Sequence, residues 1–383
     1  MEHINDEILY NQPIVLDNGS ALLKAGFGGD DKPKCFEYSL IGTPKYDKVM
    51  VGGVEKGKFV GNLAQEYRGL LKLRYPMDHG IIENWEHMET VWDHIFKDCL
   101  KVSNLGEHPL VVTEAPLNPK PNREKMCETL FESFNIPALY IANPAVLSLY
   151  ASGRTTGCVV EAGDGYCSSV PIYEGFALTP SIRRIDIGGR DITKHLQLQL
   201  RKSTGMWLYS SSEQEIVRLI KENGCYICSN HKKEEEKFLL DQEKKSISFK
   251  LPDGKNLVIG PGRFRAPEIL FNPLLIGSED SSLPDMIMQS ISKVDIDLRS
   301  KLLNNITLSG GSTMFQGFCD RLITELDFSV DKTTKVRILA PPERKYSAFI
   351  GGSILANLST FRNMWVTKDQ WEGDNRIIEN KFM

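Results

Sequence analysis

Near the N-terminus, an aspartate, a serine and a lysine are spaced as a phosphate-binding turn requires. Three apolar residues at 14–16 precede the string DNGS at 17–20, and a second apolar run that contains Lys24 follows. Short β-prone runs around Asn and Gly predict a β-hairpin, because both residues tolerate a left-handed backbone. Turn amides and the Ser20 hydroxyl can bind phosphate oxygens, Lys24 can supply a cation, and Asp17 can hold Mg²⁺ through water. A plain surface hairpin carries the same pattern, so this stretch alone does not decide between the two interpretations.

A second stretch repeats this arrangement later in the chain. Residues 158–172 read CVVEAGDGYCSSVPI, in which an apolar run leads to Glu161, then to Gly163, Asp164 and Gly165, and then to another β-prone run. Two strand–acid–glycine turn–strand units in one chain predict a duplicated architecture. If the two hairpins face each other, they can clamp a polyphosphate from both sides. We therefore predict two facing domains with a nucleotide between them.

Composition and charge exclude several classes of protein. The chain has 383 residues, of which 25% are charged, and its formal net charge is −4. This length suits two domains or one large α/β body. Without a basic excess to neutralise phosphate backbones, direct nucleic-acid binding is not expected. The N-terminus lacks the basic flank and apolar core of a signal peptide, and no apolar run approaches the length that spans a membrane.

The cysteines predict reduced, buried thiols rather than a disulfide framework. Eight cysteines are scattered through the chain, mostly within apolar stretches. This usage is typical of a cytosolic or nuclear protein. Cys225 and Cys228 have CxxC spacing, but no second pair or histidine partner follows nearby. We therefore expect one face of a helix there rather than a zinc or redox site.

Elements that could position the two turns alternate between strand and helix, which predicts an α/β fold. The expected elements are a helix over 84–100, a strand and proline-rich turn over 111–122, a helix over 123–134, a strand over 138–142 and a helix that opens at Pro144. A serine-capped helix is expected over 211–226. Glycines follow predicted strands in residues 182–191 and in residues 306–315. In 306–315 a strand is followed by Gly-Gly and then by a helix that begins with Ser and Thr. The glycines there suit a bound sugar or phosphate at the start of the helix, or serve only tight packing.

Taken together, these stretches resemble the actin superfamily from about residue 11 to residue 368. The strings that carry the resemblance are DNGS with KAGF at 17–27, TEAPLNPK at 113–120, SLYASGRTTG at 148–157, GDG at 163–165, LSGGSTMF at 308–315 and APPERKYS at 340–347. Within the superfamily, NQPIVLDNGS, SSSEQEIVR, GPGRFRAPE and SGGSTMFQGFCDRL are most similar to the actin-related proteins of the dynactin filament. Dynactin is the cofactor of cytoplasmic dynein.

The resemblance implies the actin/Hsp70/hexokinase-like ATPase fold, with two duplicated lobes, four subdomains in all, around a nucleotide cleft. One lobe is expected to comprise residues 1–151 and 346–383, with a filament-contact subdomain inserted at 39–75. The other is expected to comprise residues 152–345, with a subdomain inserted at 188–278. Residues 42–61 match the loop that docks onto the next subunit of a filament, and His79 matches a histidine involved in domain packing.

The resemblance also implies a set of residues that bind ATP or ADP with Mg²⁺. Asp17 and Asp164 would serve the metal through water, Ser20 and Lys24 would contact phosphates, and the 163–166 backbone would oppose them. The full expected nucleotide set is Asp17, Gly19, Ser20, Lys24, Gly163, Asp164, Gly165, Gly189, Lys221, Glu222, Gly310, Gly311, Met314 and Lys345. No catalytic residue is assigned beyond a weak case for Glu161 and Asp164.

Four departures from the family pattern concern ATP hydrolysis, which depends on ordering a water in line with the terminal phosphate. Pro144 stands where the family has a water-holding glutamine, and Ser168 where it has a histidine. Glu161 is one methylene longer than the usual aspartate, and Ala21 adds a Cβ to the first phosphate loop. Neighbouring groups or water could compensate for each change. We expect slow hydrolysis or none.

The function implied is a structural one. The chain is expected to polymerise, to join other dynactin subunits, and to scaffold dynein and its cargo adaptors in the cytoplasmic cytoskeleton. An active ATPase or chaperone-like use of the same cleft is one alternative, although no added substrate-binding domain is evident. A nuclear actin-related subunit of a chromatin-remodelling complex is another; such proteins usually carry large insertions, whereas this chain keeps near-actin length.

Overall fold

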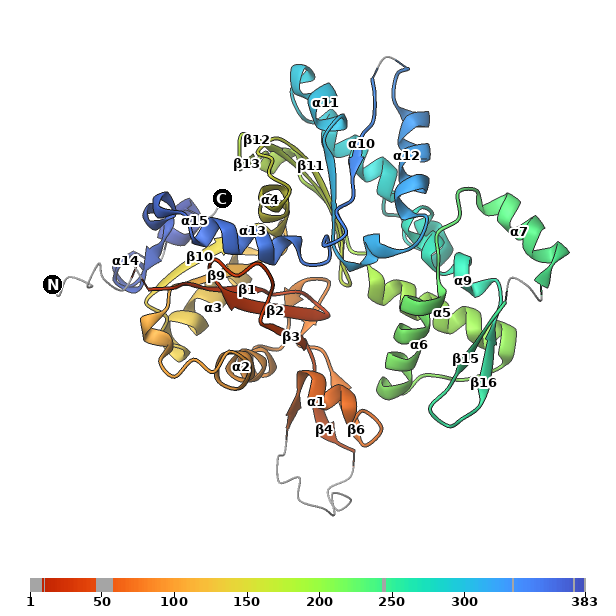
Figure 1. Ribbon diagram of the computed structural model, residues 1–383, viewed down its shortest axis with the longest axis horizontal. Helices are drawn as coiled ribbons and strands as arrows, with labels where there is room; N and C mark the ends of the chain where they lie inside the picture. The colour runs from red at the N-terminus through yellow and green to blue at the C-terminus, as the bar shows by residue number, and fades with distance from the viewer. Residues whose placement is uncertain are drawn as a thin grey trace.

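The computed structural model describes residues 9, 11–45, 58–242, 246–332, 334–374 and 376–381. Two large mixed sheets, each covered by helices, dominate the molecule (Figure 1). The α/β prediction is confirmed.

The first large sheet is built on the N-terminal hairpin. β1 pairs antiparallel with β2, with Asp17 opposite Lys24, while β1, β9 and β10 run parallel. Every residue of β1 is buried, as expected for a strand covered on both faces. In spatial order the strands are β19 (Val366–Thr367), β10 (Ala138–Ala142), β9 (Leu110–Thr113), β1 (Ile14–Asp17), β2 (Leu22–Phe27) and β3 (Cys35–Tyr38).

The second large sheet repeats this topology. β11 forms an antiparallel hairpin with β12 and pairs in parallel with β17, which in turn pairs in parallel with β18. The strands in order are β13 (Phe176–Ala177), β12 (Cys167–Tyr173), β11 (Gly157–Ala162), β17 (Ile306–Ser309) and β18 (Ile338–Leu339), with β14 (Arg183–Ile185) also on β12. The series β3-β2-β1-β9-β10 and β13-β12-β11-β17-β18 correspond strand for strand. The predicted duplication is therefore confirmed.

Each sheet has its own hydrophobic core. Trp92, Phe96 and Phe131 fill the core beside the first sheet, and Ile287, Phe318 and Leu322 belong to that beside the second. Helices of the first part are α2 (Trp85–His94), the π-helix Ile95–Cys99, α3 (Lys120–Glu128), the π-helix Thr129–Ser133, α4 (Pro144–Ala151), α13 (Ser347–Ala356), α14 (Lys368–Gly373) and α15 (Ile377–Lys381). Those of the second are α5 (Gly189–Thr204), α6 (Ser211–Gly224), α7 (His231–Leu240), α9 (Gly262–Arg265), α10 (Leu283–Ser292), α11 (Ile296–Leu303) and α12 (Phe318–Ser329).

Smaller units extend from both parts (Figure 1). Below the first sheet lie a three-stranded sheet and a short helix, and a two-stranded sheet lies beside α6. Another two-stranded sheet follows the three-stranded one in the chain. The elements of these units are β4 (Ile41–Pro44), β5 (Phe59–Val60), β6 (Leu71–Arg74) and α1 (Gly61–Glu66), then β7 (Met77–Asp78) with β8 (Ile81–Ile82), and β15 (Ile247–Lys250) with β16 (Asn256–Ile259). Most of the expected filament-contact loop, residues 46–57, lies outside the described residues. The exact domain boundaries stay a prediction.

α4 and α13 cross at the junction between the two large sheets (Figure 1). The chain passes to the second sheet after α4 and returns just before α13. A Cβ added to Gly351 would lie 1.8 Å from the carbonyl oxygen of Leu147, so the two helix backbones touch directly. Beside this crossing, three buried serine hydroxyls lie within hydrogen-bond distance of one another: Ser148 to Ser309 is 2.9 Å, Ser309 to Ser347 is 3.0 Å, and Ser347 to Ser148 is 3.0 Å.

Three local predictions were wrong or incomplete. Cys225 and Cys228 do not lie on a helix: α6 ends at Gly224, and Cys225 is extended where its amide caps the helix end. After β17, Gly-Gly leads only into a 3-10 turn (Gly311–Met314), and the full helix begins at Phe318. The helix predicted over 123–134 begins earlier, at Lys120, and changes to a π-helix at Thr129.

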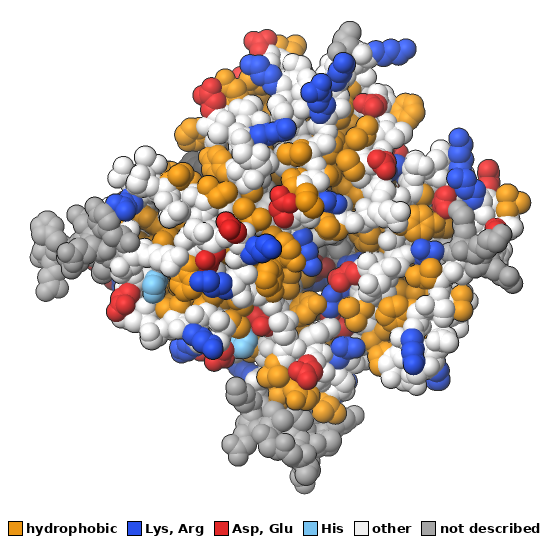
Figure 2. All heavy atoms as spheres, viewed as in Figure 1, with side chains coloured by type: hydrophobic (Ala, Val, Ile, Leu, Met, Phe, Trp, Pro, Cys, Tyr) orange, Lys and Arg blue, Asp and Glu red, His pale blue; other side chains and the backbone are white. Residues whose placement is uncertain are grey.

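Other features of the described part of the chain agree with the composition. All eight cysteines are free, and most are buried. Among the described residues, none of the helices has both the length and the apolar character needed to span a bilayer. Acidic and basic side chains are interspersed over the face shown in Figure 2.

Candidate functional site

The two predicted hairpin turns lie face to face between the large sheets. A Cβ on Gly165, in the second turn, would lie only 2.7 Å from the Oγ of Ser20 in the first. His79 Nδ1 lies 2.7 Å from the carbonyl oxygen of Gly165. The predicted facing arrangement is therefore observed, and His79 contacts the opposite turn, as expected for a packing role.

A cavity of about 560 Å³ lies between these turns, a volume in the range of small-molecule sites. Its walls come from both halves of the chain. The predicted residues that line it are Asp17, Gly19, Ser20, Lys24, Glu161, Gly163, Asp164, Gly165, Lys221, Glu222, Gly310, Gly311, Met314 and Lys345. Gly189 does not line the cavity, but its carbonyl oxygen accepts a 2.7 Å hydrogen bond from Lys221 Nζ, which does.

Asp17 is held in place by the neighbouring strand and by the hairpin itself. The hydroxyl of Thr113, at the end of β9, donates to Asp17 Oδ1 at 3.1 Å and accepts from the amide of Asn18 at 2.9 Å. Lys24 Nζ lies 2.7 Å from Asp17 Oδ2. Parallel pairing of β1 and β9 thus fixes the acid, and antiparallel pairing of β1 and β2 fixes the lysine.

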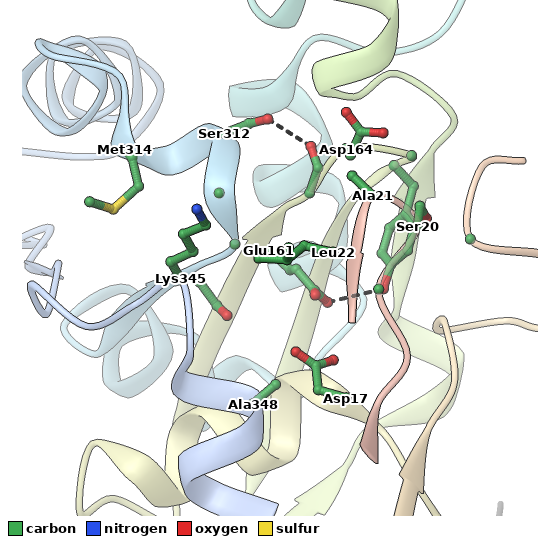
Figure 3. Close-up of a pocket in the computed structure, with 18 of the residues that line it drawn as sticks. Asp17, Ser20, Ala21, Leu22, Glu161, Asp164, Ser312, Met314, Lys345 and Ala348 are labelled. Atoms are coloured by element: carbon green, nitrogen blue, oxygen red, sulfur yellow. Dashed lines mark hydrogen bonds between the residues drawn. The ribbon is translucent and has the colours of Figure 1, made fainter. Parts of the chain in front are cut away.

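Acidic groups concentrate at this end of the cavity. Figure 3 shows the carboxyl groups of Asp17 and Glu161 pointing toward one another from β1 and β11. Burial and then the charge of Asp17 raise the pKa of Glu161 to about 7. Paired carboxylates in a low-dielectric site repel each other, so a cation between them would be favoured. Oxygen donors of this kind suit a hard cation such as Mg²⁺. That Asp17 and Asp164 hold its water shell stays a prediction.

The opposite wall of the cavity is built around the turn that follows β17. Gly310 has a φ of +94°, and a Cβ there would lie 2.3 Å from the carbonyl oxygen of Ala162, so glycine is required at this turn. Ser312 Oγ donates to the carbonyl oxygen of Gly163 at 2.7 Å and joins this wall to the second hairpin turn. Met314 and Lys345 lie on the same side of the pocket in Figure 3. Burial lowers the pKa of Lys221.

The four departures from the family pattern occupy different places. Pro144 and Ala21 line the cavity, and Pro144 is the first residue of α4. Glu161 also lines it, and accepts a 3.3 Å hydrogen bond from Tyr166 Oη. Ser168 is fully buried on β12 and is not part of the cavity wall. Its Oγ has no hydrogen-bond partner among the described residues.

Residues that join the two halves across the cavity were not predicted. Arg190 donates to the carbonyl oxygens of Met77 and Ser20, at 2.9 and 3.3 Å, and its Nε lies 3.3 Å from Asp164 Oδ2. Arg184 donates to the carbonyl oxygen of His79. Both arginines lie within residues 182–191, where only Gly189 was expected to contribute to the site.

A second unpredicted bridge joins the outer parts. Tyr75 Oη donates to Glu215 Oε1 at 2.6 Å, and Gln65 Nε2 donates to Glu215 Oε2 at 3.1 Å. Arg218, which lines the cavity, lies 2.7 Å from the same carboxylate. Residues from the two halves of the chain are therefore joined directly at Glu215. No single-residue signal in the sequence marks Tyr75 and Gln65 as partners of Glu215, because these two contacts span 140 and 150 residues.

Comparisons with known proteins agree with this geometry. A family model described as Actin matches residues 8–383. The chain is 56% identical over 384 aligned residues to "Centractin" of Saccharomyces cerevisiae, with 100% of both chains covered. It is 51% identical over 377 residues to "Actin-like protein" of Neurospora crassa, with 98% of this chain and 99% of that protein covered. Together with the duplicated sheets, these matches confirm the fold class that the sequence resemblance implied.

Proposed function

Because this chain belongs to the actin family, we propose that it is a nucleotide-binding subunit of the short dynactin filament. In this role it polymerises with copies of itself, joins other dynactin subunits, and scaffolds cytoplasmic dynein and its cargo adaptors in microtubule-based transport. Repeating one weak contact along a filament strengthens binding through effective concentration. The full-length similarity to centractin supports this assignment over a general actin-like role.

The nucleotide is ATP or ADP with Mg²⁺, bound in the cavity between the two hairpin turns. The single observation that carries this proposal is the meeting of both turns at one cavity, with Lys24, Asp17 and Asp164 at its walls. Lys24 and Ser20 would contact phosphates, and turn amides would add donors. Bound Mg²⁺ would neutralise phosphate charge.

Hydrolysis at this site is slow or absent. An in-line water needs side chains that hold it, and Pro144 offers the cavity no donor or acceptor from its ring. Ser168 is buried away from the cavity wall, so its hydroxyl does not take over that task. Loss of such positioning groups costs about 10²-fold or more in rate. The nucleotide therefore has a structural role: it holds the two halves in the shape that assembles.

Two measurements on the purified full-length protein test assembly and nucleotide binding. Electron microscopy should show short rods of limited length, and mass spectrometry should find one ATP or ADP per chain. Monodisperse single particles at assembly concentrations would contradict the filament proposal. Rods that form from protein with no bound nucleotide would contradict its structural role.

Replacing Pro144 by Gln tests the hydrolysis proposal. Single-turnover phosphate release from wild-type filaments should be about 10²-fold slower than from an actin that keeps the water-holding groups. Pro144→Gln should accelerate release, whereas Pro144→Ala, which removes the proline without adding an amide, should not. Equal rates for the two variants would show that the effect of the substitution comes from the start of α4 and not from the amide.

A further inference from the structure

A cluster of metal-ligating side chains lies outside the nucleotide cavity, at the edge strand β3 of the first sheet. The ligand atoms of Cys35, Glu37 and Cys99 all lie within 4.8 Å of one another. Within the described ranges, this is the one group of three or more His, Cys, Asp or Glu side chains with such spacing. Cys35 is 4% exposed, whereas Glu37 and Cys99 are half-buried. The cluster is therefore sheltered but open to solvent on one side.

Local structure explains why these side chains meet. Cys35 and Glu37 are two residues apart on β3, so their side chains lie on one face of the strand. The π-helix Ile95–Cys99 packs against that strand and brings Cys99 to the same place. The amide of Leu100 donates to the carbonyl oxygen of Ile95 at 2.9 Å, which is the i→i+5 bond that defines this wide turn.

The π turn also brings a histidine beside the cluster. At about 100° per residue, an α-helix would rotate Cys99 roughly 140° away from His94. In the structure, His94 Nε2 lies 3.5 Å from Cys99 Sγ. π-helical turns inserted into α-helices frequently occur at functional sites. Here the turn completes a potential set of two thiols, one imidazole and one carboxylate.

The two distances from Cys99 to its neighbours fit a tetrahedral zinc ion. Zinc bonds of about 2.0–2.3 Å place neighbouring ligand atoms roughly 3.3–3.8 Å apart. Cys99 Sγ lies 3.5 Å from His94 Nε2 and 3.8 Å from Glu37 Oε1. Cys35 Sγ is within 4.8 Å of both the Cys99 sulfur and the Glu37 carboxylate. His94 lies beside Cys99 but is not among the three side chains whose ligand atoms all lie within 4.8 Å of one another. Its ring would have to turn toward Cys35 and Glu37 to complete the set around one ion.

Outer hydrogen bonds already orient two of the four side chains. His94 Nδ1 lies 2.7 Å from Asp98 Oδ2, and a carboxylate on the second ring nitrogen is the usual support of a zinc-bound histidine. Asn62 donates from its amide to Glu37 Oε2 at 2.6 Å and from Nδ2 to Oε1 at 3.0 Å. Metal-binding carboxylates are usually held in this way.

We propose that Cys35, Glu37, Cys99 and His94 bind one zinc ion, with Asp98 as the positioning residue of His94. Two thiolates and an imidazole select a borderline-soft cation over Mg²⁺. The ion would join the edge strand β3 to the π-helix. Through Asn62 it would also tie this part of the sheet to α1, the helix that follows the expected filament-contact loop.

Zinc stoichiometry of variants tests the site. Full-length reduced protein is equilibrated with Zn²⁺ in excess Mg²⁺ and ATP, desalted, and analysed by inductively coupled plasma mass spectrometry. Wild-type protein should retain one zinc per chain. Cys35→Ser and Cys99→Ser should each weaken retention by about tenfold or more, and Asp98→Asn by about tenfold with all four ligands present. Cys319→Ser is the matched control, because Cys319 is a partly exposed cysteine on α12 outside the cluster. It should retain zinc as the wild type does.

A spectroscopic measurement keeps the test independent of folding defects. Co²⁺ bound at the site should show a thiolate-to-cobalt charge-transfer band that Cys99→Ser weakens while the far-ultraviolet circular dichroism is unchanged. Equal zinc retention by the wild type and both cysteine variants would overturn the proposal. So would reduced wild-type protein that takes up no zinc and forms a Cys35–Cys99 disulfide on exposure to air.

Discussion

Replacing Gly165 by Ala should weaken nucleotide binding, because the added methyl group would press the two hairpin turns apart. A Cβ at this position would lie 2.7 Å from Ser20 Oγ, 2.9 Å from the amide nitrogen of Gly80 and 3.0 Å from the Cα of His79. The serine hydroxyl can rotate away. The other two atoms are backbone on the opposite side of the cleft, so relief requires the two sides to separate.

The expected magnitude follows from the cost of overpacking. An extra methyl group in a well-packed contact costs about 1–3 kcal/mol. If this cost falls on the closed, nucleotide-bound state, affinity decreases by about 5-fold to 150-fold, at roughly 1.4 kcal/mol per tenfold. The 2.7 Å contact between His79 Nδ1 and the carbonyl oxygen of Gly165 would lengthen as well.

Equilibrium titration of the monomer with a fluorescent ATP analogue and Mg²⁺ measures this effect. Gly69→Ala is the matched control, since a Cβ there would meet nothing within 4 Å. The control should bind as the wild type does. If Gly165→Ala binds nucleotide within twofold of the control, the two turns do not act as a clamp, and the reasoning from their contact is refuted.

Two further predictions concern stability. The pKa of Glu161 is raised to about 7, which means that the folded protein favours the protonated carboxyl group. The stability that this group contributes is therefore fully present below its ordinary pKa near 4.5 and is lost as the pH rises through about 7. Glu161→Gln should therefore stabilise the nucleotide-free protein at pH 8, by at most about 3 kcal/mol, but should not stabilise it at pH 4.5. Chemical denaturation at both pH values measures the two effects. Equal effects at pH 8 and pH 4.5 would contradict the prediction. Glu268→Gln should destabilise the protein by about 2–4 kcal/mol, because it leaves buried Arg321, 2.9 Å from Glu268 Oε1, without its buried anion. Thermal denaturation measures the loss, and the exposed pair of Glu86 and Lys58 provides the control. Glu86→Gln should leave the midpoint of the wild type unchanged. If Glu268→Gln also has the wild-type midpoint, the buried pair does not stabilise the protein.

Local sequence patterns predicted the parts of the site that lie within one hairpin. The string DNGS and the string GDG each specify a turn with an acid, and those turns face the cavity as expected. Period and capping signals also located α2, α4 and α6, because Asn84, Pro144 and Ser210 stand at helix starts. These features depend on neighbours in the sequence, which is why sequence alone predicts them.

Contacts between distant segments could not be read from such patterns. The interaction of Tyr75 with Glu215 joins residues 140 positions apart, and Arg190 reaches Met77 across 113 positions. The CxxC prediction failed for a related reason. Cys225 and Cys228 were expected on one face of a helix because no metal partner follows them. In the structure α6 ends at Gly224, where a Cβ would lie 2.6 Å from the side chain of Ile247 on β15. Tertiary packing decides where that helix stops.

The backbone contact between Gly351 and Leu147 limits how the molecule can move. No side chain separates α4 from α13 at that point, so one helix cannot slide along the other. A twist of the two halves about this crossing would leave the contact in place. In such a twist, atoms move in proportion to their distance from the crossing. A neighbouring molecule that binds the outermost residues would therefore need less force to change the nucleotide cavity than one that binds near the crossing.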